Sequence, residues 1–596
     1  MILVVIVTYN GLKWIDSLLQ PFVQDREGLE VAVLDNASTD GTPQAIRERY
    51  PFVHLTEWRT NLGFGAANNK LLEQAIVGDY EGAFLLNQDA SITAEAIRAL
   101  AKYVASYPEI GLLSPKHLNA QGEVESGFAH YLPSEEREPF TEVPFINAAL
   151  WYLPRRTLET VGLFSPLFQH YGEDLDYAHR VLAEGLKIGY LPSVTAYHYR
   201  GNIGECTSEK AYQLKRAYHI AEAVHPLYPK WKRIYRGYLA PLGESVKALF
   251  GGTKEYYAHS KRLYHLVREL IAMSSTMKLW QHRPALDVDA LRRVYKRGST
   301  APLILFVYNR PKHTERVLQQ LLQQGEIQET KVYIWSDGAR DTADESAVNE
   351  VRDLCQRYFP DAEMHKQVSN IGLARSVVQG VTYVLERHSR VIVLEDDLVL
   401  SPYFLRWIND ALELYEQYPE IAHLHAGTFY TTRRLRHNHS LRFAGSWGWG
   451  TWRDRWQELW EPDGSKLLEQ LQKNPEIRRH FNYGGFMNFT QMLRRQTMGE
   501  NDSWAVRWHA SIVLHGRLSI SSNPPLVANA GFDNSGTHSG GGGRYRTAVA
   551  PYPLYADSNI MLKEDPKARR ILLRYYMVKN NKLAKGWYKL KELLGR

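Results

Sequence analysis

One pattern occurs twice in this chain of 596 residues. Each copy begins with an apolar strand that ends in a polar turn, LVVIVTYN in the first and PLILFVYN in the second. A second strand ending in Asp, a turn with the pattern Asn-x-Gly and a third strand ending in polar residues follow in the same order. The equivalent landmarks, which lie 299 to 309 residues apart, are Tyr9 and Tyr308, Asp35 and Asp337, Asn61 and Asn370, and Asp89 and Asp397. This order and spacing indicate an internal repeat.

The repeat favours an α/β fold. In both copies the strands alternate with helical stretches, such as residues 43–49 and 313–324, and this alternation is typical of a parallel sheet with helices on both faces. The chain is also too long for one ordinary core. We therefore expect an α/β domain at 1–205, a basic helical connector at 206–298, a second α/β domain at 299–550 and a basic helical tail at 551–596.

Composition excludes several classes of protein. With 44% hydrophobic and 23% charged residues, the chain is typical of globular proteins. No apolar run reaches the roughly 18 to 20 residues that span a bilayer, and the apolar start lacks the basic region and cleavage site of a signal peptide. Two cysteines, Cys206 and Cys355, exclude a disulfide framework and a cysteine-rich zinc site. We expect a soluble, cytoplasmic, multidomain protein.

The positive charge is concentrated in two segments. The whole chain has a formal net charge of +7, whereas residues 201–300 alone carry +10 and residues 551–596 carry +7. Both segments are aromatic and read as helical, and basic amphipathic helices of this kind suit an anionic membrane surface or an anionic acceptor. The alternative is a solvated helical linker and a docking tail.

Polar residues gather at the expected strand ends, where open α/β sheets bind ligands. Asp35 and Asp337 could each accept a hydrogen bond from a nucleobase or a ribose hydroxyl, or could cap the helix that follows. The glycines of the two Asn-x-Gly turns, Gly63 and Gly372, would bring backbone close to a ligand just before a helix whose N-terminus favours an anion.

The third strand of the second copy ends in three acids, Glu395, Asp396 and Asp397. Adjacent carboxylates at the end of a buried strand repel one another, so the arrangement calls for a cation. Mg²⁺ or Mn²⁺ could bridge the carboxylates to a diphosphate, and the alternative is a solvated acidic turn. The first copy has Asn87, Gln88 and Asp89 instead, so its cation would bind more weakly or would need another ligand, such as His198.

Several motifs carry a family resemblance. Residues 1–200 contain VTYNG, LDNASTDGT, NLGFGAANN, LLNQDA and GEDLDYAHRVLAEG, and they resemble family 2 glycosyltransferases of the GT-A fold, particularly the bacterial rhamnosyltransferase-like branch. Residues 300–540 contain FVYNRPKH, IWSDGARD, VLEDDLVL, SWGWGTWRDRW and NDSW, and they resemble the N-acetylglucosaminyltransferase I group of GT-A enzymes. The resemblance implies two tandem GT-A domains that each transfer a sugar from a nucleotide donor.

The resemblance also implies roles for individual residues. Asp174 would be the general base of the first domain, with Glu173 and Asp176 in reserve, although these acids could simply favour a helix N-terminus. Asp502 would be the base of the second. The expected donor-binding residues are Thr8, Tyr9, Asp35, Asn61, Gly63 and Asn87 in the first copy, and Tyr308, Asn309, Asp337, Asn370, Arg375, Glu395 and Asp396 in the second.

The metal ligands expected for Mg²⁺ or Mn²⁺ are Asp89 and Asp397, with His198 and His538 as further candidates. Each histidine could bind a metal as neutral imidazole, contact the diphosphate when charged, or have an ordinary structural role. The glycine-rich loop around His538 could close over a donor, with Arg544 and Arg546 meeting phosphate, or could have no role.

Together these inferences predict a bifunctional inverting glycosyltransferase that adds two sugars to a growing bacterial surface glycan, such as O-antigen, capsule or exopolysaccharide. We expect nucleotide-sugar donors, a lipid-linked acceptor, a peripheral position on the inner face of the cytoplasmic membrane and no nucleic-acid partner. Two alternatives stay open. One half could be active while the other serves acceptor binding or assembly, or the whole chain could be a non-catalytic scaffold that binds nucleotides or glycans.

Overall fold

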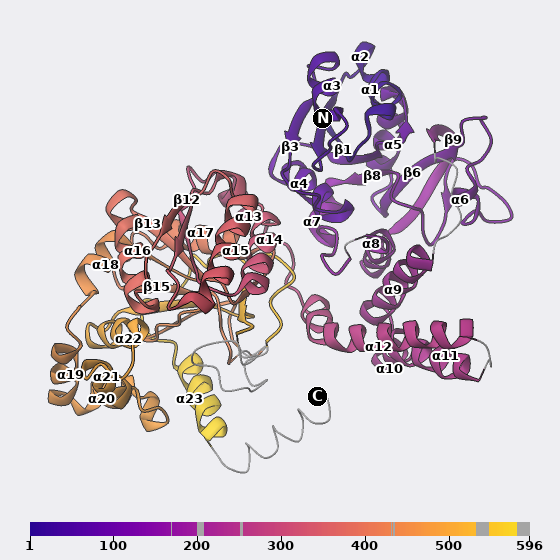
Figure 1. The fold of residues 1–596 in the computed structure, drawn as a ribbon. Coiled ribbons are helices and arrows are strands. Elements are labelled where there is room, and N and C mark those ends of the chain that lie inside the picture. Colours follow the sequence, from indigo (N-terminus) through magenta and orange to yellow (C-terminus); the bar gives the residue numbers. More distant parts are fainter. Residues whose placement is uncertain are drawn as a thin grey trace. The chain divides into compact units, whose positions relative to one another are not determined.

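The computed structural model divides the chain into two compact units, Met1–Tyr295 and Lys296–Arg596, which are drawn in Figure 1. The finer division into two domains, a connector and a tail stays a prediction. The structure describes residues 1–168, 170–199, 208–250, 254–430, 432, 435–531 and 547–580.

The first unit is built on a mixed sheet with the strand order β3-β2-β1-β4-β8-β6-β9-β5, in which β7 also pairs with β9. β1 is parallel to β2 and β4, whereas β8 is antiparallel to β4 and β6. The expected parallel sheet is therefore found from β3 to β4, whereas β8 runs antiparallel to its neighbours and departs from that expectation. Between β6 and β8 the described chain forms only α6 and β7, which is not the long helical crossover that parallel neighbours need. The strands are β1 (Ile2–Thr8), β2 (Leu29–Asp35), β3 (His54–Glu57), β4 (Gly82–Asn87), β5 (Ala90–Ser91), β6 (Ile110–Leu118), β7 (Thr141–Glu142), β8 (Leu150–Pro154) and β9 (Lys187–His198).

The sheet of the second unit has the order β12-β11-β10-β13-β17-β15-β18-β16 and repeats the strand directions of the first. β10 is parallel to β11 and β13, and β17 is antiparallel to β13 and β15. The predicted internal repeat is confirmed at the level of topology. The strands are β10 (Leu303–Val307), β11 (Val332–Ser336), β12 (Glu363–Lys366), β13 (Arg390–Glu395), β15 (Ile421–His425), β16 (Asn438–Leu441), β17 (Trp449–Trp452) and β18 (Leu518–Ser522), with a separate pair of β14 (Leu398–Leu400) and β19 (Val527–Asn529).

Helices connect and cover these strands (Figure 1). In the first unit they are α1 (Ile15–Leu19), α2 (Pro21–Gln24), α3 (Thr42–Arg49), α4 (Phe64–Val77), α5 (Ala94–Ser106), α6 (Ser126–Ala129), α7 (Arg155–Val161), α8 (Glu173–Ala183), α9 (Ser208–Val224), α10 (Lys230–Ile234), α11 (Ala240–Leu249), α12 (Lys254–Gln281) and α13 (Val288–Tyr295), with a π-helical turn at Tyr235–Leu239. In the second unit they are α14 (Pro311–Leu322), α15 (Thr342–Tyr358), α16 (Leu373–Arg387), α17 (Phe404–Leu414), α18 (Arg453–Leu459), α19 (Gly464–Lys473), α20 (Pro475–Phe481), α21 (Phe489–Thr497), α22 (Trp504–Leu514) and α23 (Pro566–Asn580).

The central strands are near-continuous apolar runs because helices cover both of their faces. β1 and β10 are buried along almost their whole length. The core of the second unit is rich in tryptophan, with Trp449, Trp456 and Trp508 packed together. The aromatic motif SWGWGTWRDRW therefore serves mainly the core of the second unit.

The basic segments differ in how they pack. The helices of the predicted connector, from α9 to α13, belong to the first unit. In the predicted tail, α23 buries Leu572 and Tyr576 against Tyr430 and Tyr483 of the second unit. This helix therefore has its apolar face covered, which favours the alternative of a docking tail, while residues 581–596 lie outside the described part of the chain. Among the described residues, no helix combines the length and apolarity needed to cross a membrane.

Candidate functional site

The first sheet brings three of the expected donor-binding residues to one edge. In the parallel register Thr8 lies beside Asp35, and Asn87 lies beside the residue before Thr8. The buried Asp35 carboxylate accepts hydrogen bonds from Thr8 Oγ1 at 2.9 Å and from both the backbone N–H and the hydroxyl of Ser38. Asp35 therefore shapes the turn after β2. It is not the N-cap of α3, because that position belongs to Gly41.

The Asn-x-Gly turn is held by Asn36, which the sequence analysis did not single out. Its Oδ1 accepts from the backbone N–H of Leu62 at 2.7 Å, and its Nδ2 donates to Asn61 Oδ1 at 2.9 Å. Asn61 Oδ1 also accepts from the N–H of Gly63, whose φ of +80° is readily available to glycine, and α4 begins at the next residue. The predicted turn at a helix N-terminus is thus present at the sheet edge.

The end of β4 contacts the turn after β1 through the side chain of Gln88. Its side-chain amide accepts from Tyr9 N at 2.9 Å and donates to Tyr9 O at 3.3 Å, while the Tyr9 side chain is exposed. A Cβ added at Gly11 would collide with Gln88 Oε1. The glycine of the VTYNG motif therefore leaves room for the Gln88 side chain in this position.

Asp89 and His198 lie side by side, as a shared site requires. The residue after Asp89 pairs with His198 across β5 and β9, and Tyr199 N donates to the Asp89 carbonyl at 2.7 Å. His198 Nε2 lies 3.6 Å from Asp89 Oδ1, and the His198 side chain is only 3% exposed. This places a carboxylate and an imidazole together beside the Asn87 end of β4.

The acids of α8 separate into different roles. Asp176 forms a buried ion pair with Arg180 at 2.8 Å, which identifies it as a structural residue. Glu173 packs against the first turn of α4, because a Cβ added at Gly65 would lie 3.7 Å from the Glu173 Cβ. Burial, followed by the neighbouring Asp174, raises the pKa of Glu173 to about 7, and its Oε2 is buried without a hydrogen-bond partner. Glu173 is therefore a base candidate alongside the half-buried Asp174.

The second sheet builds a similar edge with different side chains. Asp337 follows β11 and accepts from the backbone N–H groups of Ile371 and Gly372, at 2.9 and 3.1 Å. Asn370 Nδ2 donates to the carbonyl of Gly338 at 3.0 Å. Gly338 must be a glycine because an added Cβ would lie 2.7 Å from backbone atoms of Ser369.

The acidic strand end of the second unit is partly neutralised by Arg310, which the sequence analysis missed. Its guanidinium donates to Asp396 Oδ1 at 2.6 Å and to Asp397 Oδ2 at 3.2 Å. Burial raises the pKa of Asp396 to about 6, although Arg310 opposes that shift. Burial and the two neighbouring aspartates raise the pKa of Glu395 to about 8. Some of the positive charge that the sequence analysis assigned to a metal is thus supplied by an arginine.

Tyr308 and Asn309 hold the first loop of this edge. Tyr308 N donates to Asp396 Oδ2 at 3.3 Å, and the Tyr308 hydroxyl donates to Asp344. Asn309 Nδ2 donates to the same Asp344 carboxylate at 2.8 Å. Asp344 lies in the first turn of α15, so these contacts tie the loop after β10 to that helix.

Asp502 lies beside the Asn-x-Gly turn of the second unit. It precedes α22 and is exposed, and a Cβ added at Gly372 would lie 2.9 Å from Asp502 Oδ2. Arg375 is exposed in the first turn of α16, which begins after Gly372. The structure therefore brings Asp502 and Arg375 to the same helix N-terminus. His538, Arg544 and Arg546 lie outside the described residues.

Comparison with known proteins supports a transferase assignment for the first unit. Residues 3–147 match the family model described as glycosyl transferase family 2. The matched residues all lie within the first unit. A curated relative, N-acetylglucosaminyl-diphospho-decaprenol L-rhamnosyltransferase, was found in two strains of Mycobacterium tuberculosis, CDC 1551 / Oshkosh and ATCC 25618 / H37Rv. Each is 27% identical over 234 residues, which cover 33% of this chain and 76% of the relative.

Solved structures give more distant similarities. A fragment of S. aureus TarS in complex with UDP-GlcNAc is 19% identical with a TM-score of 0.33, covering 50% of this chain and 92% of the fragment. The mannosyltransferase PcManGT from Pyrobaculum calidifontis, in complex with GDP-Man and Mn²⁺, is 19% identical with a TM-score of 0.27, covering 49% of this chain and 79% of that one. GalNAc-T7 with UDP, GalNAc and Mn²⁺ is 13% identical with a TM-score of 0.31, covering 48% and 58%.

Proposed function

We propose that the chain is a bifunctional inverting glycosyltransferase with two GT-A domains, each using its own nucleotide-sugar donor. The observation that carries the proposal is the repetition of one arrangement. In both sheets, the turn after β1 or β10, the Asp at the end of β2 or just after β11, and the polar end of β4 or β13 lie at one edge. The family 2 match covers the first of these edges, and the shared topology extends the proposal to the second.

In the first unit the donor would lie along Thr8, Tyr9, Asp35, Asn61, Gly63 and Asn87. The N-terminus of α4 offers backbone N–H groups to the diphosphate. Asp89 is the proposed ligand of Mg²⁺ or Mn²⁺, and His198 is a second candidate because its Nε2 lies 3.6 Å from Asp89. Asp174 would accept the proton of the acceptor hydroxyl, so that the hydroxyl attacks the sugar from the face opposite the diphosphate. Glu173 is the reserve base.

In the second unit the donor would lie along Tyr308, Asn309, Asp337, Asn370, Arg375, Glu395 and Asp396, with Asp502 as the base. Asp397, with His538 as a further candidate, would hold the divalent cation, which would neutralise charge on the leaving diphosphate. The donor set fits a hard cation, because carboxylate oxygens are its preferred ligands. With Glu395 protonated near neutral pH, Asp396 and Asp397 outweigh the single positive charge of Arg310.

The acceptor is proposed from the curated relative, whose name describes transfer of L-rhamnose to a decaprenyl-diphosphate-linked N-acetylglucosamine. A lipid-linked acceptor of this kind leads us to propose a role in the synthesis of a bacterial surface glycan, such as O-antigen, capsule or exopolysaccharide. Rhamnose is accordingly the first donor sugar to test for the first unit.

Exposed aromatic and basic side chains on helices of the first unit support this proposal. We define the connector face as the exposed aromatic side chains Trp231, Tyr235 and Phe250, which are 69, 57 and 85% exposed, together with Lys230 and Lys247 on the same helical segment. Exposed aromatic groups among lysines suit the interface of an anionic bilayer. We propose that this face holds the enzyme peripherally at the inner side of the cytoplasmic membrane.

The activity is tested by incubating the purified full-length protein with a panel of nucleotide sugars, a polyprenyl-diphosphate-linked acceptor and Mn²⁺ or Mg²⁺. We expect two successive sugar additions from two donors. Addition of a single sugar under every donor pair would favour the alternative in which one half only binds the acceptor or supports assembly.

The connector face is tested by flotation with vesicles. The full-length protein should bind vesicles containing anionic lipid, and Trp231→Ser with Phe250→Ser should reduce the bound fraction several-fold. The matched control replaces the exposed Tyr107, on the same unit, with Ser. Equal binding by all three proteins would contradict the membrane assignment.

A further inference from the structure

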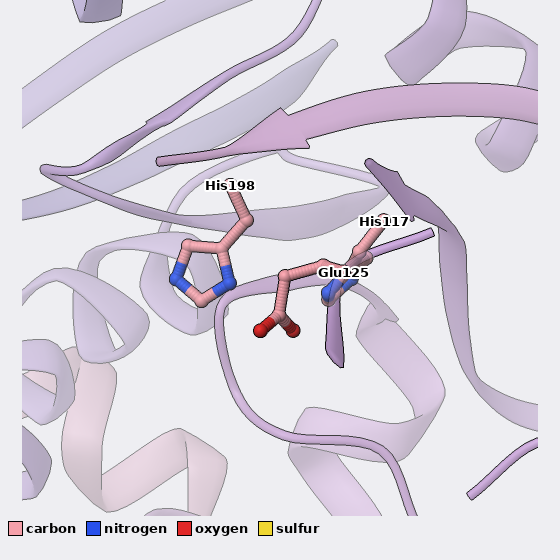
Figure 2. A group of neighbouring side chains, drawn as sticks. All are labelled: His117, Glu125 and His198. Atoms are coloured by element: carbon pink, nitrogen blue, oxygen red, sulfur yellow. The ribbon is translucent and has the colours of Figure 1, made fainter. Parts of the chain in front are cut away.

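A buried cluster of His117, Glu125 and His198 lies next to the edge of the first sheet. His117 is near the end of β6, Glu125 is the N-cap of α6, and His198 ends β9. Their side chains converge in Figure 2, and one potential ligand atom from each lies within 4.8 Å of the other two. All three residues are buried, with exposed fractions of 1, 3 and 3%.

Both imidazoles have one ring nitrogen directed to a partner outside the cluster. His117 Nε2 lies 2.9 Å from Ser114 Oγ, and His198 Nε2 faces Asp89 at 3.6 Å. The Nδ1 atom of His198 is buried and has no hydrogen-bond partner. An imidazole whose outer nitrogen is oriented in this way is typical of a metal-binding histidine, since the outer partner fixes the ring and its tautomer.

Glu125 is fixed by the backbone. One carboxylate oxygen accepts from Gly127 N and the other from Phe128 N, each at 2.9 Å. The His117 ring stacks on Phe128, with the ring centroids 4.5 Å apart. The carboxylate and one imidazole are therefore positioned by their own surroundings, independently of any donor nucleotide.

We propose that His117, Glu125 and His198 bind one divalent cation of the zinc class. Two imidazole nitrogens and one carboxylate form a ligand set that suits Zn²⁺, whereas Mg²⁺ and Ca²⁺ prefer oxygen alone. Zinc bonds to these atoms are about 2.0–2.2 Å long, so a modest rotation of the side chains brings all three onto one ion. Water or another ligand would complete the coordination.

The site has a consequence for the neighbouring edge. When Nδ1 of His198 carries the ion, the ring proton is on Nε2, which faces Asp89. In that state the Nε2 proton orients the carboxylate of Asp89, which remains the proposed ligand of the donor's cation. The ion would tie together the ends of β6 and β9 and the turn between His117 and Glu125, so its role is structural and separate from the transfer reaction.

The proposal is tested by zinc binding to the full-length protein in the absence of nucleotide. After incubation with Zn²⁺ and removal of excess metal, elemental analysis should find one equivalent more in the wild type than in Glu125→Gln or His117→Ala. The matched control, His54→Ala, removes an exposed histidine of the same unit and should bind as the wild type does. Equal zinc content in all four proteins would overturn the proposal.

Two further measurements keep the test valid if a variant folds poorly. Co²⁺ added to the wild type should give the visible absorption of a low-symmetry, four- or five-coordinate nitrogen and oxygen site, and Zn²⁺ should abolish it. Titration of Glu125→Gln, which preserves side-chain shape, should give at least a tenfold weaker affinity. Absence of the Co²⁺ spectrum in the wild type would identify the cluster as ordinary core packing and contradict the site.

Discussion

The two sheet edges make the same backbone contact with different chemistry. In the first unit Tyr9 N donates to the neutral amide of Gln88, and in the second Tyr308 N donates to the carboxylate of Asp396. The position after the Tyr-Asn pair differs in a matching way. It is Gly11 where the amide needs room and Arg310 where the carboxylates need a counter-charge.

The Asn-x-Gly turns show a second difference of this kind. The amide of Asn36 accepts from Leu62 N in the first unit, whereas the carboxylate of Asp337 accepts from Ile371 N and Gly372 N in the second. One backbone arrangement is therefore held by amide groups in one copy and by charged groups in the other. The backbone geometry of the edge is therefore repeated in the two units, whereas the charges at the edge differ. Four predictions test this difference.

The largest effect is expected from the two bases. Asp174→Asn should lower the first transfer by about 10²–10⁴-fold, and Asp502→Asn should lower the second by a similar factor, because each removes a general base. Single-turnover rates of both transfers should be measured on each variant, so that the unaffected transfer is the internal control. Loss of both transfers in either variant would contradict the proposal of two independent sites.

Arg310→Ala should destabilise the second unit by about 3–5 kcal/mol, because it leaves Asp396 and Asp397 buried without their counter-charge. Gln88→Ala should lower the free energy of unfolding of the first unit by only about 1 kcal/mol, because the variant loses hydrogen bonds between neutral groups. Urea denaturation monitored by tryptophan fluorescence compares the two. A similar cost for both variants would mean that the charge difference does not matter to folding.

Both units contain a glutamate whose pKa is raised by burial, to about 7 for the buried Glu173 and about 8 for the half-buried Glu395. Each carboxyl group binds its proton more tightly in the folded chain than in the unfolded chain, where the pKa of a glutamate is 4.5. The free energy of unfolding should therefore fall as pH rises from about 4.5 to the folded pKa, by at most about 1.4 kcal/mol per pH unit for each group.

Glu173→Gln and Glu395→Gln should each reduce this dependence of the free energy of unfolding on pH. The reduction should reach up to about pH 7 for Glu173→Gln and up to about pH 8 for Glu395→Gln. Thermal unfolding of the variants and the wild type between pH 5 and 8 measures the difference. A steeper decline in either variant would show that burial does not govern these carboxyls.

The smallest effect concerns two glycines. Gly338→Ala should destabilise the second unit by about 1–3 kcal/mol, because the added methyl meets the backbone of Ser369. Gly11→Ala should cost less, since the obstructing atom is the end of the Gln88 side chain, which can turn away. Chemical denaturation of both variants checks the order, and a larger cost at Gly11 would reverse it.

Much of the fold could be predicted because the repeat uses local signals. Apolar runs ending at Asp35 and Asp337 fixed the parallel strands, and the Asn-x-Gly turns fixed two helix starts. The antiparallel β8 and β17 could not be predicted, since their pairing depends on contacts between distant segments. Arg310, Asn36 and Glu125 were missed for the same reason. Arg310 and Asn36 lie inside motifs, but their partners come from another strand end or turn, and Glu125 lies in no motif and approaches His117 and His198 only in the folded chain.

Whether the chain holds two separate donor sites can be decided by counting the nucleotides that it binds. Isothermal titration of the full-length protein with the nucleoside diphosphates of its two donors, in the presence of Mn²⁺, should give two equivalents per chain. Asp397→Asn should weaken binding at one site and leave the other unchanged. One equivalent for the wild type at saturation would contradict the account.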